Sequence, residues 1–170
     1  KNEKVDNFNF KMLNKINLNS FDLTAYPEVG KVYKLLAKNL KIPIKQLVLT
    51  SGSDFGIRTC FDFFCRDKKP IICLKPTFGM VDVYAKLHGI RKIEIDYDNQ
   101  LNLNLKKLFN SINRKISLII IANPNSPTGT IIDKVNMYKI LIKAKSHDVP
   151  VLIDEAYQGF CNQTYINDLK

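Results

Sequence analysis

The chain has 170 residues, of which 45% are hydrophobic and 25% are charged, a composition typical of one globular domain with a buried core. Its 26 Lys and Arg residues outnumber its 16 Asp and Glu residues and give a formal net charge of +10. The basic residues are spread from Lys1 to Lys170, with nothing denser than residues 66–69, so they indicate a solvated surface and no nucleic-acid partner.

Metal sites, disulfides and membrane segments are also disfavoured. The four cysteines have neither C-x-x-C spacing nor a neighbouring histidine cluster, which predicts reduced thiols and no metal. The N-terminal residues lack the continuous apolar run of a signal peptide, and no later segment approaches the length of a membrane span. We therefore expect a cytoplasmic protein with no membrane partner.

In chain order, residues 1–29 predict an irregular or partly disordered arm, rich in Asn and Lys, that packs on a partner. From residue 30 onward, short apolar runs alternate with helical patterns, which predicts βαβ units and a mostly parallel sheet. The expected helices cover residues 31–40, 55–65, 78–88, 105–112 and 134–145, and the expected strands cover residues 46–50, 71–74, 93–96, 118–122 and 151–153. Gly89 ends one helix and Asp133 caps another. The predicted fold class is α/β, a three-layer α/β/α domain.

Ligands of open α/β sheets lie beyond the carboxyl ends of the strands, so the segments after the predicted strands are the candidate sites. Ser51-Gly52-Ser53-Asp54 opens a helix, where free backbone N–H groups and the helix dipole favour a phosphate. A plain helix cap is the alternative for this segment.

Two further strand ends have unusual composition. Residues 123–129, N-P-N-S-P-T-G, combine two prolines and a glycine that fix the backbone with polar side chains that stay free, although a proline-stabilised turn explains the same pattern. Residues 154–157, D-E-A-Y, place a carboxylate directly at a strand end, where it could also be a helix cap or a metal ligand.

In this order and spacing, the segments resemble class I and II aminotransferases, which are fold-type I pyridoxal 5′-phosphate (PLP) enzymes with the pattern N-P-x-N-P-T-G followed by D-E-A-Y. Residues 25–30 (AYPEVG), 50–54 (TSGSD) and 75–89 (KPTFGMVDVYAKLHG) resemble the histidinol-phosphate aminotransferase branch and its decarboxylase relatives. The resemblance spans residues 26–160 and implies PLP as the cofactor. It also implies that residues 30–170 are part of a PLP-binding large domain, following an arm over residues 1–29.

The resemblance assigns the catalytic roles to Asp154 and Tyr157. Asp154 is expected to pair with the protonated pyridine nitrogen, which keeps the ring able to accept electrons. Tyr157 is expected to donate a hydrogen bond to the phenolic oxygen O3′ of the cofactor. The family places an Asn before P-T-G as a second O3′ partner. This chain has Ser126 there, with Asn125 one residue earlier, so both are candidates for that contact.

The remaining cofactor contacts also follow from the resemblance. Ser53 and Asp54 are expected to offer backbone N–H groups, and Ser53 its hydroxyl, to the phosphate. Phe78 is expected to stack on the pyridine ring. Tyr26 matches a tyrosine that reaches the phosphate of the cofactor in the other subunit, which implies a homodimer.

Several other polar residues are expected to be structural. His88 and His147 lie at the ends of predicted helices, where a cation suits the helix dipole, and no hydrolase motif includes them. Glu155 is next to Asp154 on a strand end, so the two side chains are expected on opposite faces.

The lysine that holds the cofactor as a Schiff base is expected beyond Lys170, as are the arginines that bind the phosphate and the substrate carboxylate. We therefore expect an N-terminal fragment of an aminotransferase that uses an amino acid and a keto acid or a phosphorylated ketone. A PLP-dependent decarboxylase of phosphorylated amino acids shares these motifs and stays open. A non-catalytic module derived from such an enzyme is the alternative from another class, and a basic nucleic-acid-binding domain is a more distant one.

Overall fold

The structure, a computed structural model, describes residues 8–17, 19–20 and 24–166. The chain divides into two compact units, of which one ends at residue 47 and the other begins at residue 48. The first unit contains helix α1 (Phe8–Leu13), helix α3 (Gly30–Leu40) and the short 3-10 helix η1 (Ile44–Gln46). Helix α3 confirms the helix predicted over residues 31–40.

The prediction of an irregular arm is wrong for the residues of α1. The sequence FNFKML contains Lys, Met and Leu, which are good helix formers, and this local preference outweighs the Asn-rich surroundings. Residues 1–7, where part of that prediction falls, lie outside the described residues.

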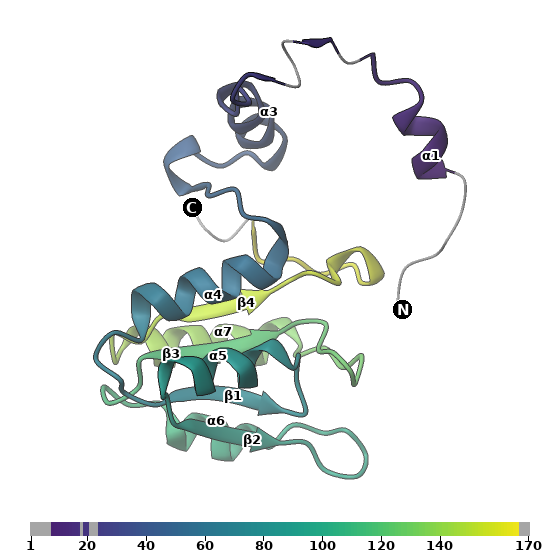
Figure 1. The fold of residues 1–170 in the computed structure, drawn as a ribbon. Coiled ribbons are helices and arrows are strands. Elements are labelled where there is room, and N and C mark those ends of the chain that lie inside the picture. The colour runs from purple at the N-terminus through teal and green to yellow at the C-terminus, as the bar shows by residue number, and fades with distance from the viewer. Residues whose placement is uncertain (1–7, 18, 21–23, 167–170) are drawn as a thin grey trace. The chain divides into compact units, whose positions relative to one another are not determined.

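The second unit is built on a four-stranded parallel sheet with the order β2-β1-β3-β4 (Figure 1). Its elements in chain order are α4 (Gly52–Phe64), β1 (Ile71–Lys75), α5 (Met80–His88), β2 (Lys92–Asp96), α6 (Leu105–Ser111), β3 (Leu118–Ala122), α7 (Lys134–Lys145), β4 (Val151–Asp154) and the 3-10 helix η2 (Gln158–Phe160). The predicted βαβ succession over this part of the chain is confirmed.

Helices cover both faces of the sheet, which confirms the three-layer α/β/α prediction (Figure 1). Successive side chains of a strand point to opposite faces, so the continuous apolar runs supply both cores. One face carries Ile71, Cys73, Leu118 and Ile120 against Ile57 and Phe61 of α4 and Val81, Tyr84 and Ala85 of α5. The other face carries Ile72, Leu74, Ile95, Ile119 and Ile121 against Leu108 of α6 and Met137, Ile140 and Ala144 of α7.

The predicted helix ends are confirmed by their capping geometry. The Asp133 side chain accepts a hydrogen bond from the backbone N–H of Asn136 and caps α7. Gly89 follows α5 with φ of 63°, a left-handed conformation that glycine adopts without steric cost. No helix in the described ranges has both the length and the apolar character to cross a bilayer.

The strand predicted over residues 46–50 is wrong. Residues 44–46 form η1, and residues 47–50 have no regular secondary structure. The apolar run LVL, residues 47–49, suggested a buried strand, but Val48 is 76% exposed and the segment pairs with no strand among the described residues. An extended segment without a neighbour gains no backbone hydrogen bonds, so the local pattern alone does not make it a strand.

Candidate functional site

The carboxyl ends of the parallel strands meet at one edge of the sheet, which we call the carboxyl edge. A cavity of about 120 Å³ lies there. Its lining consists of Ser53, Phe78, Ala122, Pro124, Ser126, Asp154, Ala156 and Tyr157. Five of these residues are predicted site residues, and they come from four separate segments that the sequence analysis placed after strands or at a helix start. The fold therefore brings most of the predicted site together.

The cavity is small for a complete ligand, since binding sites for whole cofactors usually occupy about 300 to 1,000 Å³. A wider apolar groove of about 690 Å³ adjoins it and runs between α4 and β4. Ser53, Asp154 and Ala156 line both spaces. The cavity therefore suits one part of a ligand, such as a ring, whose other parts extend past the start of α4.

The start of α4 presents unpaired backbone donors to this region. The first N–H groups of a helix have no partners within the helix and lie at its positive end. Gly52 adopts φ of 80°, and the Thr50 hydroxyl donates to its carbonyl oxygen at 2.8 Å, which shapes the tight turn into α4. A residue with a side chain would be strained at this φ. The segment at Ser53 and Asp54 is thus a helix start, as predicted.

The Asp54 side chain does not line the cavity. Its Oδ1 accepts a hydrogen bond from the hydroxyl of Tyr84 on α5 at 3.0 Å. Burial and this hydrogen bond raise the pKa of Tyr84, so the phenol stays protonated and donating. Asp54 therefore ties the start of α4 to α5, and only its backbone N–H is available toward a ligand.

Asp154 and Tyr157 both line the cavity from the end of β4. Asp154 Oδ1 accepts a hydrogen bond from the backbone N–H of Ala156 at 3.0 Å, which orients the carboxylate. Its carbonyl oxygen accepts from the backbone N–H of Asn123 at 2.9 Å, which joins the ends of β3 and β4. Tyr157 packs its ring on Phe160 with the centroids 6.1 Å apart.

Three hydroxyl groups on the cavity wall are free to bind a ligand. Among the described residues, the side chains of Ser53, Ser126 and Tyr157 have no hydrogen-bond partner, although all three line the cavity. Together with the Asp154 carboxylate, they place three donors and one anion around an otherwise apolar space.

Asn125 is buried and lies outside the cavity lining. Its Oδ1 accepts from the Thr77 hydroxyl at 2.9 Å, and its Nδ2 donates to the carbonyl oxygen of Pro76 at 2.9 Å and to the Thr128 hydroxyl at 2.8 Å. The Asn125 side chain therefore makes three hydrogen bonds, and all three are to other groups of the protein. Of the two candidates for the second O3′ contact, Ser126 faces the cavity and Asn125 does not.

Asn123 is a polar residue without a predicted role in the site. Its side chain is completely buried, and its Oδ1 accepts from the backbone N–H of Ile132 at 2.8 Å. Its Nδ2 has no partner in the described part of the chain. Its position in the sequence could have indicated that it belongs near the site, because it is the first polar residue after the apolar strand β3 and precedes Pro124, which lines the cavity.

Glu155 and the two histidines have structural contacts, as predicted. The Glu155 carboxylate accepts from the Thr164 hydroxyl and from the backbone N–H of Tyr165, away from the cavity. His88 ends α5, its Nε2 lies 3.3 Å from Oδ1 of Asp62, and its ring stacks on Phe61. His147 Nδ1 lies 3.0 Å from the carbonyl oxygen of Lys143 at the end of α7.

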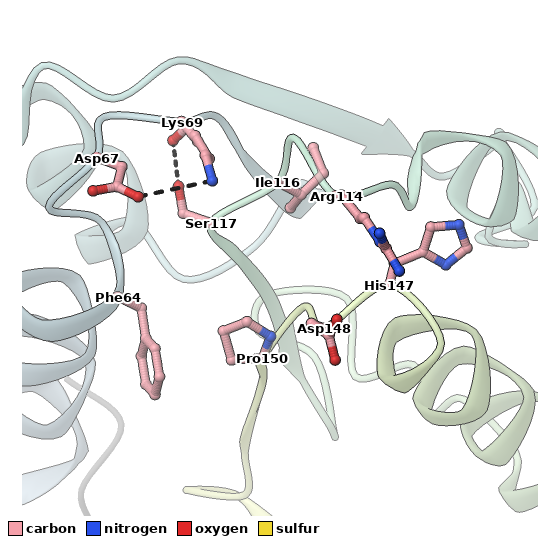
Figure 2. Close-up of a pocket in the computed structure, with 9 residues that line it drawn as sticks. All are labelled: Phe64, Asp67, Lys69, Arg114, Ile116, Ser117, His147, Asp148 and Pro150. Atoms are coloured by element: carbon pink, nitrogen blue, oxygen red, sulfur yellow. Dashed lines mark hydrogen bonds and ion pairs between the residues drawn. The ribbon is translucent and has the colours of Figure 1, made fainter.

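A second hollow, of about 340 Å³, lies where the strands begin, at what we call the amino edge (Figure 2). It is lined by Phe64, Asp67, Lys69, Arg114, Ile116, Ser117, His147, Asp148 and Pro150. Helices α4 and α7 end beside it, so their negative dipole ends account for the basic side chains there. Lys69 is further engaged by Asp67 at 3.7 Å (Figure 2). This hollow combines no nucleophile with an oriented base and is not the candidate site.

Two predictions concern parts of the chain apart from the cavity. Tyr26 lies in the first unit and is 99% exposed, and its predicted role toward a second subunit stays a prediction. Among the described residues, no group of three His, Cys, Asp or Glu side chains is arranged to hold a metal ion.

The sequence model of the family described as aminotransferase class I and II matches residues 18–168. The chain belongs to the class I and II aminotransferases. The histidinol-phosphate aminotransferase of Dehalococcoides mccartyi is 32% identical over 146 residues, covering 85% of this chain and 40% of that protein. The predicted resemblance is therefore confirmed, and the chain spans about two fifths of the length of such relatives.

Solved structures of this class share the fold. The histidinol-phosphate aminotransferase of Clostridium acetobutylicum aligns with a TM-score of 0.73 and 23% identity, over 86% of this chain and 44% of that one. Cystalysin from Treponema denticola, which contains a pyridoxal 5′-phosphate cofactor, aligns with a TM-score of 0.63 and 18% identity, over 85% of this chain and 38% of that one. The predicted cofactor is thus the one used by the family.

Proposed function

We propose that this chain forms part of a PLP-dependent aminotransferase that binds the cofactor ring in the carboxyl-edge cavity. The observation that supports this most directly is the lining of that cavity, which combines one carboxylate, three free hydroxyls and an aromatic ring beside a helix start. These groups match the needs of PLP, which has a basic ring nitrogen, a flat ring, a phenolic oxygen and a phosphate. The residues present therefore fit the cofactor.

Each group has a defined task in this function. The Asp154 carboxylate accepts a hydrogen bond from the protonated ring nitrogen and keeps the proton there. The hydroxyls of Ser126 and Tyr157 donate to the phenolic oxygen. Phe78 packs on the flat face of the ring. When bound, PLP supplies a cationic ring that withdraws electrons from the bond that breaks at the substrate Cα.

The phosphate binds at the start of α4 in this proposal. Ser53 lines the cavity, and the backbone N–H groups of Ser53 and Asp54 lie in the first turn of α4, where an anion is stabilised by about 0.3 to 1 kcal/mol through the helix dipole alone. The groove beside α4 continues from Ser53 and leaves room for the group that links ring and phosphate.

The substrates proposed are an amino acid and a keto acid or a phosphorylated ketone, on the basis of the names of the relatives. A homodimer with Tyr26 at the phosphate of the neighbouring site, a cytoplasmic location and a cofactor-holding lysine beyond Lys170 belong to the same proposal. No part of this proposal assigns a role to a residue at the amino edge.

The test uses the full-length protein purified with added PLP. We expect an absorption band near the visible edge that borohydride reduction removes, and mass spectrometry of the peptides is expected to find the reduced cofactor on a lysine outside residues 1–170. A correctly folded protein without this adduct would contradict the proposal and favour a non-catalytic module. With histidinol phosphate as amino donor, conversion of a keto acid to the corresponding amino acid is expected, whereas release of CO2 from a phosphorylated amino acid would indicate a decarboxylase.

A further inference from the structure

The two walls of the cavity that come from β1 and β3 are joined behind the cavity by side-chain hydrogen bonds. Phe78 follows β1 and Ser126 follows β3, and both face the cavity. The residues immediately before them, Thr77 and Asn125, are hydrogen-bonded to each other at 2.9 Å across 48 positions of sequence. A hydrogen bond between two residues outside the cavity lining therefore joins the two walls.

Asn125 is the centre of this arrangement. It is 2% exposed, and besides the bond from Thr77 it donates to the carbonyl oxygen of Pro76 at 2.9 Å and to the Thr128 hydroxyl at 2.8 Å. Its backbone N–H donates to the carbonyl oxygen of Thr130 at 2.8 Å. One side chain thus fixes the exit of β1 and the turn of the loop after β3.

The arrangement extends to the exit of β2. The hydroxyls of Thr128 and Thr130 lie 2.7 Å apart. The backbone N–H of Tyr97 donates to the carbonyl oxygen of Lys75 at 3.1 Å, which joins the exit of β2 to the end of β1. Tyr97 directly follows β2 and is half-buried. The exits of three neighbouring strands are therefore connected by hydrogen bonds, and those of β1 and β3 are connected through polar side chains. A buried, satisfied network of this kind holds its members in one arrangement.

We propose that Thr77 and Asn125 are positioning residues for the ring of the cofactor, because they set the distance between Phe78 and Ser126. This inference rests on the proposed binding of PLP in the cavity. A ligand binds only the fraction of molecules whose walls are correctly spaced, so its apparent affinity falls in proportion to that fraction. Without the Thr77–Asn125 bond, the distance between Phe78 and Ser126 varies more. A smaller fraction of the molecules then has the distance that the ring requires.

The chain contains a matched control for this bond at the amino edge. The Ser117 hydroxyl donates to the carbonyl oxygen of Lys69 at 2.5 Å, which joins the starts of the same two strands, again across 48 positions. Ser117 is 7% exposed and does not line the cavity. Its removal costs one hydrogen bond between β1 and β3 but leaves the cavity walls unchanged.

The experiment measures the affinity of PLP and of pyridoxal, which has the same ring without the phosphate, for the full-length protein. The variants are Thr77→Val, Thr77→Ser and Ser117→Ala, with the melting temperature of each recorded without ligand. For Thr77→Val we expect both ligands to bind about 2-fold to 10-fold more weakly by the same factor, the loss that one hydrogen bond produces. Thr77→Ser is expected to restore wild-type affinity, and Ser117→Ala is expected to lower only the melting temperature.

Three outcomes would overturn the inference. Equal affinity of the wild type and Thr77→Val would show that the bond does not set the walls. Loss of affinity for PLP alone would place the effect at the phosphate, and an equal loss in Ser117→Ala would attribute it to general stability. If the wild type binds neither ligand, the proposed function itself fails, a result distinct from the other three because it appears before any substitution. Asn125→Ala serves as a second variant, with the same expected direction for both ligands.

Discussion

The two edges of the sheet are built from the same four strands and four helices but differ in what their polar groups do. At the carboxyl edge, the hydroxyls of Ser53, Ser126 and Tyr157 face a cavity and have no partner among the described residues. At the amino edge, Lys69 and His147 are engaged by neighbouring groups of the chain. The free hydroxyls therefore gather at the carboxyl edge, around the small cavity and the groove that adjoins it.

The direction of the chain explains this difference. In a parallel sheet, every helix begins at the carboxyl edge and ends at the amino edge, so unpaired N–H groups gather at one and unpaired carbonyl oxygens at the other. Lysine and histidine side chains compensate the carbonyl ends of the helices, as His147 does at the end of α7. The hydroxyl groups without partners therefore distinguish the carboxyl edge from the amino edge.

The largest effect is expected from removing the carboxylate at the carboxyl edge, with removal of a carboxylate at the amino edge as the control. Asp154→Ala should weaken the binding of PLP by about 4 kcal/mol, roughly 1,000-fold, because the protonated ring nitrogen loses its partner in a partly buried site. Asp148→Ala, at the amino edge, should leave the affinity unchanged. Equilibrium dialysis of the full-length protein measures both, and equal losses in the two variants would remove the distinction between the edges.

The next effect concerns stability. Asn125→Ala removes three side-chain hydrogen bonds, so the free energy of unfolding should fall by about 2 to 3 kcal/mol. Ser117→Ala removes one and should cost about 1 kcal/mol. Urea denaturation of both variants compares the edges directly. Equal costs would mean that the network around Asn125 adds nothing beyond one bond.

A smaller effect is expected at two glycines with left-handed backbone. Gly52 has φ of 80° at the start of α4, and Gly89 has φ of 63° at the end of α5. Alanine at either position should cost about 1 to 2 kcal/mol of stability, because its Cβ is strained there. Gly52→Ala should also weaken PLP relative to pyridoxal, whereas Gly89→Ala should affect both ligands equally or not at all. An unchanged ratio in Gly52→Ala would contradict the placement of the phosphate.

The smallest effect we expect is a pH dependence from the amino edge. Burial raises the pKa of Cys65 to about 11, and a hydrogen bond with Ser117 offsets part of that rise. The folded state therefore favours the neutral thiol over the unfolded state, whose thiol titrates near 9.0. The contribution of Cys65 to the free energy of unfolding is therefore fully present below pH 9 and is lost as the pH rises toward 11.

Denaturation curves between pH 8 and pH 11 test the cysteine prediction. The free energy of unfolding should fall less steeply with pH in Cys65→Ala than in the wild type, while Ser126→Ala should keep the wild-type slope. Identical slopes in all three proteins would show that the thiol is not linked to folding. Cys73, whose pKa burial raises to about 12, contributes in the same direction and remains in every variant.

Much of the fold could be predicted because its signals are local. The apolar runs of β1 and β3 and the cap at Asp133 each depend on a few adjacent residues, and all were confirmed. The predicted strand at residues 46–50 was wrong for the opposite reason, since a strand also requires a neighbour that no local pattern reveals. Helix α1 was missed because its six residues are too few for a clear period.

The sequence predicted which residues come together in the site, but it did not predict which way their side chains point. Strand ends in a parallel sheet must meet at one edge, so Asp154 and Ser126 could be expected together. Whether Asn125 or Ser126 faces the cavity depends on which one finds partners in the loop after β1, 48 positions away from Asn125. The bond between Asp54 and Tyr84 spans 30 positions and has no sequence signal either.

The wide sequence separation of the cavity walls has a consequence for folding. Ser53 and Asp154 line the same small cavity, although they are far apart in the sequence of the second unit. Phe78 and Ser126 come together only after β1 has paired with β3, and α5, β2 and α6 lie between these two strands in the sequence. Contacts between such distant residues form late, because the closure of long loops must precede them. A partly folded chain therefore has no pocket to offer, and capture of a ligand by this cavity reports that folding is complete.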